Sequence, residues 1–321
     1  MRPVSLGFVA GIFTAAVVAI GFLQLPQHGA SNASSSSASS SLSSLSSSSV
    51  ARPSIVTSIK HPLFRRLRSI QTGVGKAQEG AFLIEGETQI LAALDAGYPL
   101  AEIWMAADAV SSRIASKLGS SQNGSTVATI MLTQGLMKKL FPSGKCPDAV
   151  GVATTPILSL ESVGLGNSKS LILEDIQDPG NLGTMLRCAE AFGVTHVLCV
   201  MTNHTQRLFS RVVIRASMGA IFRLKLSVTG TAKTAVSYCR RNGIRLVAST
   251  PHTNRTLSDC VPGSQCAYAI AVGNEARGLS ETMLEGANET FCISMRGDVE
   301  SLNVAVACGI MLYQATLGDV L

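Results

Sequence analysis

Four short apolar runs in the second half of the chain constrain its fold more than any other feature. The runs are LILEDI (171–176), HVLCV (196–200), IRLVAST (244–250) and AYAIAV (267–272). The segments between them include helical patterns at 182–192, 206–217 and 231–243. Strands that are buried on both faces of a parallel sheet are continuous apolar runs of this kind. The sequence therefore predicts an α/β domain over 170–321 with a mainly parallel sheet and a C-terminal helix at about 302–317.

A smaller α/β domain is predicted over residues 56–156. Apolar patterns indicate strands at 81–86, 101–106 and 126–132 and a helix at 87–97, and a short basic helix or arm precedes them at 58–73. Segment 157–169 is rich in Ser and Gly, so we expect it to be a linker between the two domains.

Residues 1–55 have the composition of a targeting leader. Residues 4–25 carry no charge and are long enough for a helix to cross a bilayer of about 30 Å, and residues 31–50 contain 14 serines. There is no Asp or Glu before Glu79. An acid-free, Ser-rich leader is typical of a cleaved organelle transit peptide, so we expect import into a plastid or mitochondrion. The alternative is a membrane anchor through residues 4–25, and membrane association is expected only if this segment is retained.

The basic charge of the protein is concentrated near its N-terminus. The net charge is +6, from 26 Lys and Arg against 20 Asp and Glu, and residues 1–78 hold seven of the basic residues and no acid. The remainder is close to neutral, so overall charge is weak evidence for RNA binding. The candidate RNA contacts lie in the basic arm, at Lys60, Arg65, Arg66 and Arg68. A solvated basic face or part of the targeting sequence explains these residues equally well.

Three polar segments each follow a predicted strand: 178–193, 272–280 and 293–307. Ligands of open α/β sheets collect at the carboxyl ends of strands, so we expect the three loops to share one site. Their glycines, which allow a ligand to approach closely or the backbone to turn left-handed, are Gly183, Gly273, Gly278 and Gly297. Ordinary turns and caps would explain any one segment alone. No G-x-G-x-x-G follows a strand, which disfavours a dinucleotide-dependent oxidoreductase. The eight cysteines show no zinc spacing, so no metal is expected.

Together these segments resemble the motifs of the SpoU (TrmH) family of SPOUT-class RNA ribose 2′-O-methyltransferases. N-x-G-x-x-x-R is present as Asn181, Gly183 and Arg187, G-N-E-x-x-G-L-S as residues 273–280, and I-P-M-x-G-x-x-x-S-L-N-V as residues 293–304. Ser294 stands where the third motif has its usual proline. The segment FLIEGETQILAALDAG (82–97) resembles the ribosomal-protein-like substrate-binding domain of the family, so the resemblance extends from about residue 58 to 318.

The resemblance implies a SPOUT domain with a deep trefoil knot, a homodimer, and S-adenosylmethionine as cofactor. It implies 2′-O-methylation of RNA, with ribosomal RNA as the first choice of substrate and tRNA as the second. The cofactor contacts it implies are Gly273, Ile293, Met295 and Leu302, and the catalytic set is Arg187, Asn181, Glu275, Ser301 and Asn303.

Within this set, Arg187 would activate the 2′-hydroxyl. Arginine keeps its proton at neutral pH, so it would accept a proton only if strongly perturbed, and otherwise it would bind phosphate and the developing oxyanion. The other four residues would orient Arg187, the ribose or the loops, and a purely structural role for Glu275 is as well supported. The alternative function is a catalytically silent RNA-binding or ribosome-assembly factor. Ser294 is the one feature of the sequence that supports this alternative.

Overall fold

The computed structural model of the protein describes residues 55–72, 80–120, 127–142, 146–154, 157–163, 169–201, 205–260, 267–298 and 301–317. Residues 1–54, which hold nearly all of the predicted leader, lie outside the described residues. Within the described ranges, no helix has the length and hydropathy needed to cross a bilayer.

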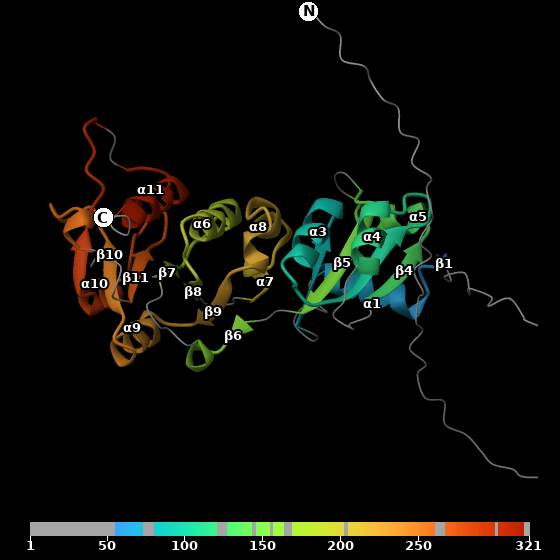
Figure 1. Ribbon diagram of the computed structural model, residues 1–321, viewed down its shortest axis with the longest axis horizontal. Helices are drawn as coiled ribbons and strands as arrows, with labels where there is room; N and C mark the ends of the chain where they lie inside the picture. The colour runs from blue at the N-terminus through green and yellow to red at the C-terminus, as the bar shows by residue number, and fades with distance from the viewer. Residues whose placement is uncertain are drawn as a thin grey trace, which may run out of the picture.

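A five-stranded mixed sheet forms the first domain (Figure 1). Its strands are ordered β1 (Ile55–Val56), β4 (Ala128–Leu132), β3 (Leu100–Ala106), β5 (Ala149–Thr154) and β2 (Ala81–Glu85). The first three strands are parallel, and β5 is antiparallel to both β3 and β2. Helices α3 (Glu87–Asp95) and α4 (Ser112–Ser120) cover one face, whereas α1 (Pro62–Thr72) and α5 (Gln134–Leu140) cover the other.

A seven-stranded sheet, parallel throughout, forms the second domain. Its strands are ordered β12 (Glu289–Phe291), β10 (Arg245–Ser249), β11 (Tyr268–Val272), β7 (Lys169–Glu174), β8 (His196–Val200), β9 (Lys225–Thr229) and β6 (Ile157–Leu158). The four apolar runs that predicted strands are β7, β8, β10 and β11, so this prediction is confirmed. Strand β6 lies in the segment expected to be a linker, where it extends the sheet beyond β9.

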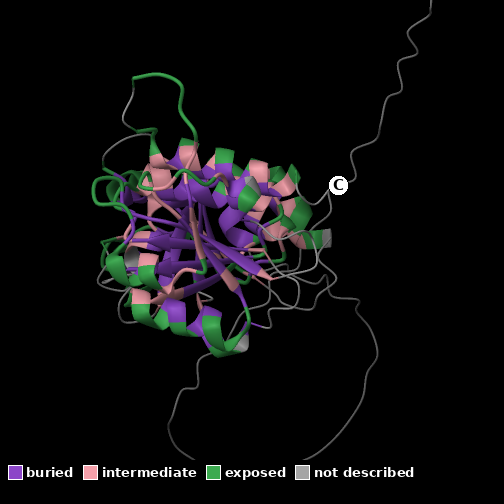
Figure 2. Ribbon diagram, turned by 90° about the vertical axis from the view of Figure 1, so that its left-hand side faces the viewer, coloured by how far each residue is buried: buried purple, intermediate pink, exposed green. Residues whose placement is uncertain are grey.

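Helices cover both faces of this sheet, and the strands between them are buried (Figure 2). One face packs against α6 (Pro179–Ala191), α7 (Thr205–Leu208), α8 (Arg211–Ala216) and α11 (Val304–Leu317). The opposite face packs against α9 (Ala232–Arg241) and α10 (Glu281–Gly286).

Two helix predictions differ from the structure, one at its start and one in its middle. Helix α6 begins at Pro179 instead of Leu182, because Asp178 is the N-cap and its Oδ1 accepts from the Asn181 amide at 2.7 Å. Proline is favoured in the first turn, where its missing N–H costs nothing. The helix expected over 206–217 is interrupted at residues 209–210, since Ser210 caps a new helix by accepting from the Val213 amide.

The two domains share one hydrophobic core. Phe82 of β2 stacks on Phe209 with ring centroids 4.5 Å apart, and Tyr98 meets Phe222 edge to face at 5.0 Å. An ion pair of 2.7 Å joins Glu85 to Arg211 at the edge of this contact. The packing therefore fixes the first domain against the α7–α8 side of the second.

Candidate active site

The central strands β7 and β11 lie side by side although the chain forms β8, β9 and β10 between them. After β7 the chain continues to β8 on one side, whereas β11 has β10 as its other neighbour. Open α/β sheets bind ligands at such a reversal of strand order, outside the carboxyl ends of the strands. The first two motif loops leave the sheet at this point.

The second motif closes into a tight loop around Asn274, a buried residue. Asn274 and Gly278 exchange two backbone hydrogen bonds of 3.0 and 2.9 Å. The Asn274 Oδ1 accepts from the amides two and three residues later, and its Nδ2 donates to the Asp175 carbonyl at 2.9 Å. Arg277 forms an ion pair with the Asp175 carboxylate. These contacts hold the loop against the end of β7.

Glu275 joins this loop to the start of α6. Its carboxylate accepts from the amides of Gln177 and Asp178, both at 3.1 Å, and from the Asn181 side chain at 3.2 Å. Partial burial acts to raise the pKa of Glu275, but these donors together with its own amide outweigh it, so the pKa lies below its ordinary value. Glu275 is therefore ionised and holds the first two motifs together. This is the structural role that the sequence offered for Glu275 beside an orienting one.

Asn181 and Asn303 connect the first motif to the third. The Asn303 Nδ2 donates to the Asn181 Oδ1 at 3.1 Å. The Asn303 Oδ1 accepts from the amides two and three residues later, at 2.9 and 3.2 Å, and thereby caps α11. A chain of hydrogen bonds thus runs from Glu275 through Asn181 to Asn303, and all three motifs meet, as predicted.

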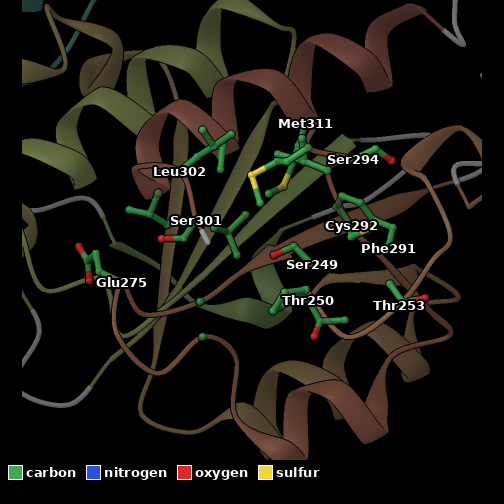
Figure 3. Close-up of a pocket in the computed structure, with 18 of the residues that line it drawn as sticks. Ser249, Thr250, Thr253, Glu275, Phe291, Cys292, Ser294, Ser301, Leu302 and Met311 are labelled. Carbon is green, nitrogen blue, oxygen red and sulfur yellow. The ribbon is translucent and has the colours of Figure 1, made fainter. Parts of the chain in front are cut away.

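A cavity of about 620 Å³ opens beside this chain of hydrogen bonds (Figure 3). Glu275 lies at one end of the view and Thr253 at the other, with Ser301 and Ser249 between them. The residues expected to contact the cofactor all line this cavity: Gly273, Ile293, Met295 and Leu302. Glu275 and Ser301 also line it, whereas Asn181 and Asn303 do not.

Arg187 stands apart from these residues. It is exposed on α6, does not line the cavity, and forms no hydrogen bond or ion pair with any residue that the structure describes. Six residues make about one and two-thirds turns of a helix, so the Arg187 and Asn181 side chains leave the axis about 120° apart. Arg187, which the resemblance places in the catalytic set, therefore lies apart from the hydrogen-bonded motif residues of its own chain.

The four basic candidates for RNA contact lie on or just before α1. Lys60, Arg65 and Arg68 are exposed, whereas Arg66 is partly buried and forms an ion pair with Glu102. The other oxygen of this carboxylate accepts from the indole of Trp104 at 2.8 Å. Arg66 therefore has a structural partner that the other three lack among the described residues.

Backbone constraints explain three of the four motif glycines without a ligand. A Cβ on Gly183 would lie 2.5 Å from the Ala216 Cβ of α8, so this glycine allows two helices to touch. A Cβ on Gly273 would lie 2.3 Å from the Gly278 backbone, and Gly278 has a φ of +70°, which glycine adopts without strain. Gly297 has neither constraint.

Sequence reasoning missed the part of the cavity that follows β10. Ser249, the last residue of β10, lines the cavity, and the loop that follows contributes Thr250, Pro251, Thr253 and Asn254. The signal was present, because these polar residues directly follow an apolar run that was itself predicted as a strand. It also missed Arg207, whose Nη2 donates to the Gln177 carbonyl at 2.7 Å and so braces the loop before α6.

Profiles of known families match both domains. The SpoU rRNA methylase family matches residues 168–313, and the N-terminal domain of thiostrepton-resistance methylases matches residues 53–162. An uncharacterised tRNA/rRNA methyltransferase of Synechocystis sp. is 30% identical over 265 residues, which cover 81% of this chain and 92% of that protein. The 23S rRNA (guanosine-2′-O)-methyltransferase RlmP of Bacillus subtilis is 27% identical over 258 residues, 80% of this chain and 97% of that protein.

Solved structures share the fold across both domains. An RNA 2′-O ribose methyltransferase superposes with a TM-score of 0.67 at 28% identity, over 84% of this chain and all of that one. The AdoMet-bound rRNA methyltransferase of Sinorhizobium meliloti gives a TM-score of 0.69 at 23% identity, over 82% of this chain and 97% of that one. Because the three motifs converge at one crevice and relatives match along both domains, the chain belongs to the SpoU rRNA methylase family.

Proposed function

We propose that this protein transfers the methyl group of S-adenosylmethionine to a ribose 2′-hydroxyl of RNA. The observation that carries this proposal is the joining of all three motifs by the Glu275–Asn181–Asn303 hydrogen bonds beside one cavity. The B. subtilis relative is named for the same reaction on 23S rRNA, and the S. meliloti structure holds AdoMet.

The cavity suits the proposed cofactor. Its volume of about 620 Å³ falls within the range of roughly 300 to 1,000 Å³ that is usual for small-molecule sites. Apolar walls for the purine and the aliphatic carbons of the cofactor come from Val272, Phe291, Ile293, Leu302 and Met311, and hydroxyls come from Ser249, Thr250, Thr253 and Ser301. Once bound, S-adenosylmethionine supplies a methyl group activated by its positive sulfur.

Arg187 is suited to meet the RNA. An exposed guanidinium presents five donors and keeps its charge, so it binds a phosphate or the oxyanion that develops on the attacking hydroxyl. The clamped loops supply the fixed geometry that an in-line transfer requires.

A homodimer belongs to the same proposal. Helix α11 is apolar around its whole circumference, yet Val306, Ile310, Tyr313 and Leu317 are 39 to 54% exposed. Their spacing of four, three and four residues places them on one face, and a helix that is apolar all round is normally buried. We expect sedimentation to show a dimer for the wild type and a monomer for Ile310→Glu. We also propose the trefoil knot that the resemblance implies.

We further propose that the RNA is ribosomal RNA of an organelle, with tRNA as the second choice. The acid-free, Ser-rich residues 1–55 support import. Imaging of a fluorescent fusion and sequencing of the mature N-terminus test this proposal. An intact N-terminus in an integral membrane fraction would favour the anchor.

Calorimetry and tritium transfer test the activity itself. The purified chain is titrated with S-adenosylmethionine and then incubated with the labelled cofactor and in vitro transcribed large-subunit rRNA or tRNA. A 2′-O-methyl group protects the adjacent phosphodiester from alkali, so we expect the label in alkali-resistant dinucleotides. RNA binding without cofactor binding would identify the assembly factor instead.

A further inference from the structure

A second cavity, of about 970 Å³, lies between the two domains. The first turn of α3 lines one side of it, and α8 with the turn at Met218 lines the other. None of the residues that line the cavity of the candidate active site lines this second cavity. We call it the interdomain groove.

Gln89 is an unsatisfied polar group in the wall of this groove. Its side chain is 8% exposed, and its amide forms no hydrogen bond with any residue in the described part of the chain. A buried polar group without a partner costs about 1 to 3 kcal/mol. Because Gln89 lines the groove, a ligand held there would supply the missing partner of its Oε1.

The start of α3 adds unpaired donors beside Gln89. Its N-cap is Gly86, which has no side chain to cap the helix. Among the described residues, the amides of 87–89 have no acceptor. Uncapped amides at a helix N-terminus attract phosphate and other anions. Of the three acidic residues that line the groove, Glu85 pairs with Arg211 and Glu87 with Arg113, whereas Asp148 is exposed and forms no ion pair with the described residues.

The opposite wall of the groove offers a cation and apolar surface. Arg215 of α8 is exposed and has no ion-pair partner in the described residues. Val212 and Met218 are 49% and 53% exposed on the same wall. A guanidinium facing unpaired amides suits a phosphate, and exposed apolar side chains suit the face of a base.

The groove is connected to the active site through packed helices. Helix α8 touches α6, which carries Asn181 and Arg187, at the close approach of Gly183 to Ala216. Helix α6 in turn packs against α11. In Figure 1, α11, α6, α8 and α3 follow one another along one side of the molecule. A strand that fills the groove therefore has a continuous path over α6.

We propose that the interdomain groove holds a stretch of the RNA substrate away from the methylated nucleotide. A phosphate lies between Arg215 and the start of α3, a ribose hydroxyl or base N–H group bonds to the Gln89 amide, and a base packs on Met218 and Val212. This inference rests on the proposed function, because it takes RNA as the substrate. It differs from the basic arm, since α1 covers the opposite face of the first sheet from α3.

Arg215→Ala tests the phosphate contact in the full chain. The probe is in vitro transcribed large-subunit rRNA, titrated at several salt concentrations. We expect three- to tenfold weaker binding and a salt slope smaller in magnitude by about 0.7 to 0.9, the value of one phosphate contact. Cofactor affinity stays unchanged. Lys233→Ala, an exposed cation on α9, is the matched control and leaves RNA affinity and slope unaltered.

Gln89→Leu separates binding from folding. Because the wild-type amide lacks a partner, we expect the variant to melt at the same or a higher temperature and still to bind RNA more weakly. A wild type that methylates RNA, with both variants binding RNA as tightly as wild type does, overturns the groove alone. A wild type that neither binds nor methylates RNA overturns the groove and the proposed function together. Weaker binding with an unchanged salt slope for Arg215→Ala contradicts the phosphate contact.

Discussion

Arg187 and Ser294 are motif residues whose side chains are exposed and form no hydrogen bond or ion pair with the described part of the chain. Asn274 and Asn303, by contrast, hold loops and caps together. Removing a side chain without contacts costs little stability. Substitutions at these two positions therefore report on ligands and not on the fold.

Arg187→Ala is expected to fold normally and to lose methyl transfer. The unfolding free energy stays within about 0.5 kcal/mol of wild type, and S-adenosylmethionine affinity is unchanged. Loss of one preorganised donor to a developing oxyanion lowers the transfer rate by roughly 100- to 1,000-fold. Tritium transfer beside calorimetry measures both effects, with Arg187→Lys as the variant that retains the charge. Near-normal turnover in Arg187→Ala would remove it from the catalytic set.

Ser294→Pro is expected to tighten cofactor binding about two- to fivefold. Neither the Ser294 amide nor its hydroxyl forms a hydrogen bond with the described residues, so proline removes no contact there. A proline presets the loop and lowers the entropy that must be lost on binding, an effect of about 0.4 to 1 kcal/mol. Paired titrations at equal salt measure it, and RNA affinity serves as the control. Unchanged or weaker binding in a folded variant would show that Ser294 itself contacts the cofactor.

The secondary-structure elements show how far the sequence determines this fold. Strands β7, β8, β10 and β11 were predictable because burial on both faces leaves an unbroken apolar run. The start of α6 was not, since Asn181 and Asp178 are both good caps and only the fold shows that Asn181 is used elsewhere, by Glu275. Likewise, the convergence of the motif loops was predictable because loops at the carboxyl ends of parallel strands meet at one edge of the sheet. The outward direction of Arg187 was not, because it depends on how α6 packs.

Gly183→Ala tests the contact between helices α6 and α8. Its Cβ would lie 2.7 Å from the Val213 carbonyl oxygen as well as against Ala216, so the helices must separate. We expect a loss of roughly 1 to 3 kcal/mol in unfolding free energy. The control is Gly309→Ala in α11, where the added Cβ meets the Cys188 Sγ at 3.4 Å. Denaturant titration compares them, and equal stability of the two variants would contradict the tight contact.

At the scale of the whole molecule, the end of the second sheet opposite the active site holds an unusual buried group. His196 begins β8 with 1% exposure, and neither ring nitrogen has a partner among the described residues. Burial, and to a lesser degree Lys225, lowers the pKa of His196 to about 4. The folded protein thus keeps this imidazole neutral where an unfolded chain would protonate it.

Stability is therefore expected to fall on acidification between pH 6.5 and about 4. In this window the unfolded state binds a proton that the folded state does not. The His196 contribution to the unfolding free energy is therefore complete above pH 6.5, and about 2 kcal/mol of it is lost at pH 5. Denaturant titrations of wild type and His196→Leu at pH 8 and pH 5 isolate the effect, because carboxylates act equally in both. Parallel losses in the two proteins would contradict a neutral His196.

The stacking of Phe82 on Phe209 makes the packing of each domain depend on the other. Each domain matches a separate family profile, as two independent modules would. Their aromatic contacts, however, lie in a single continuous core. A substitution on one side of that core has to be matched on the other, as in any close-packed interior. Chimaeras that exchange the first domain between relatives are therefore expected to have a mismatched core at this contact.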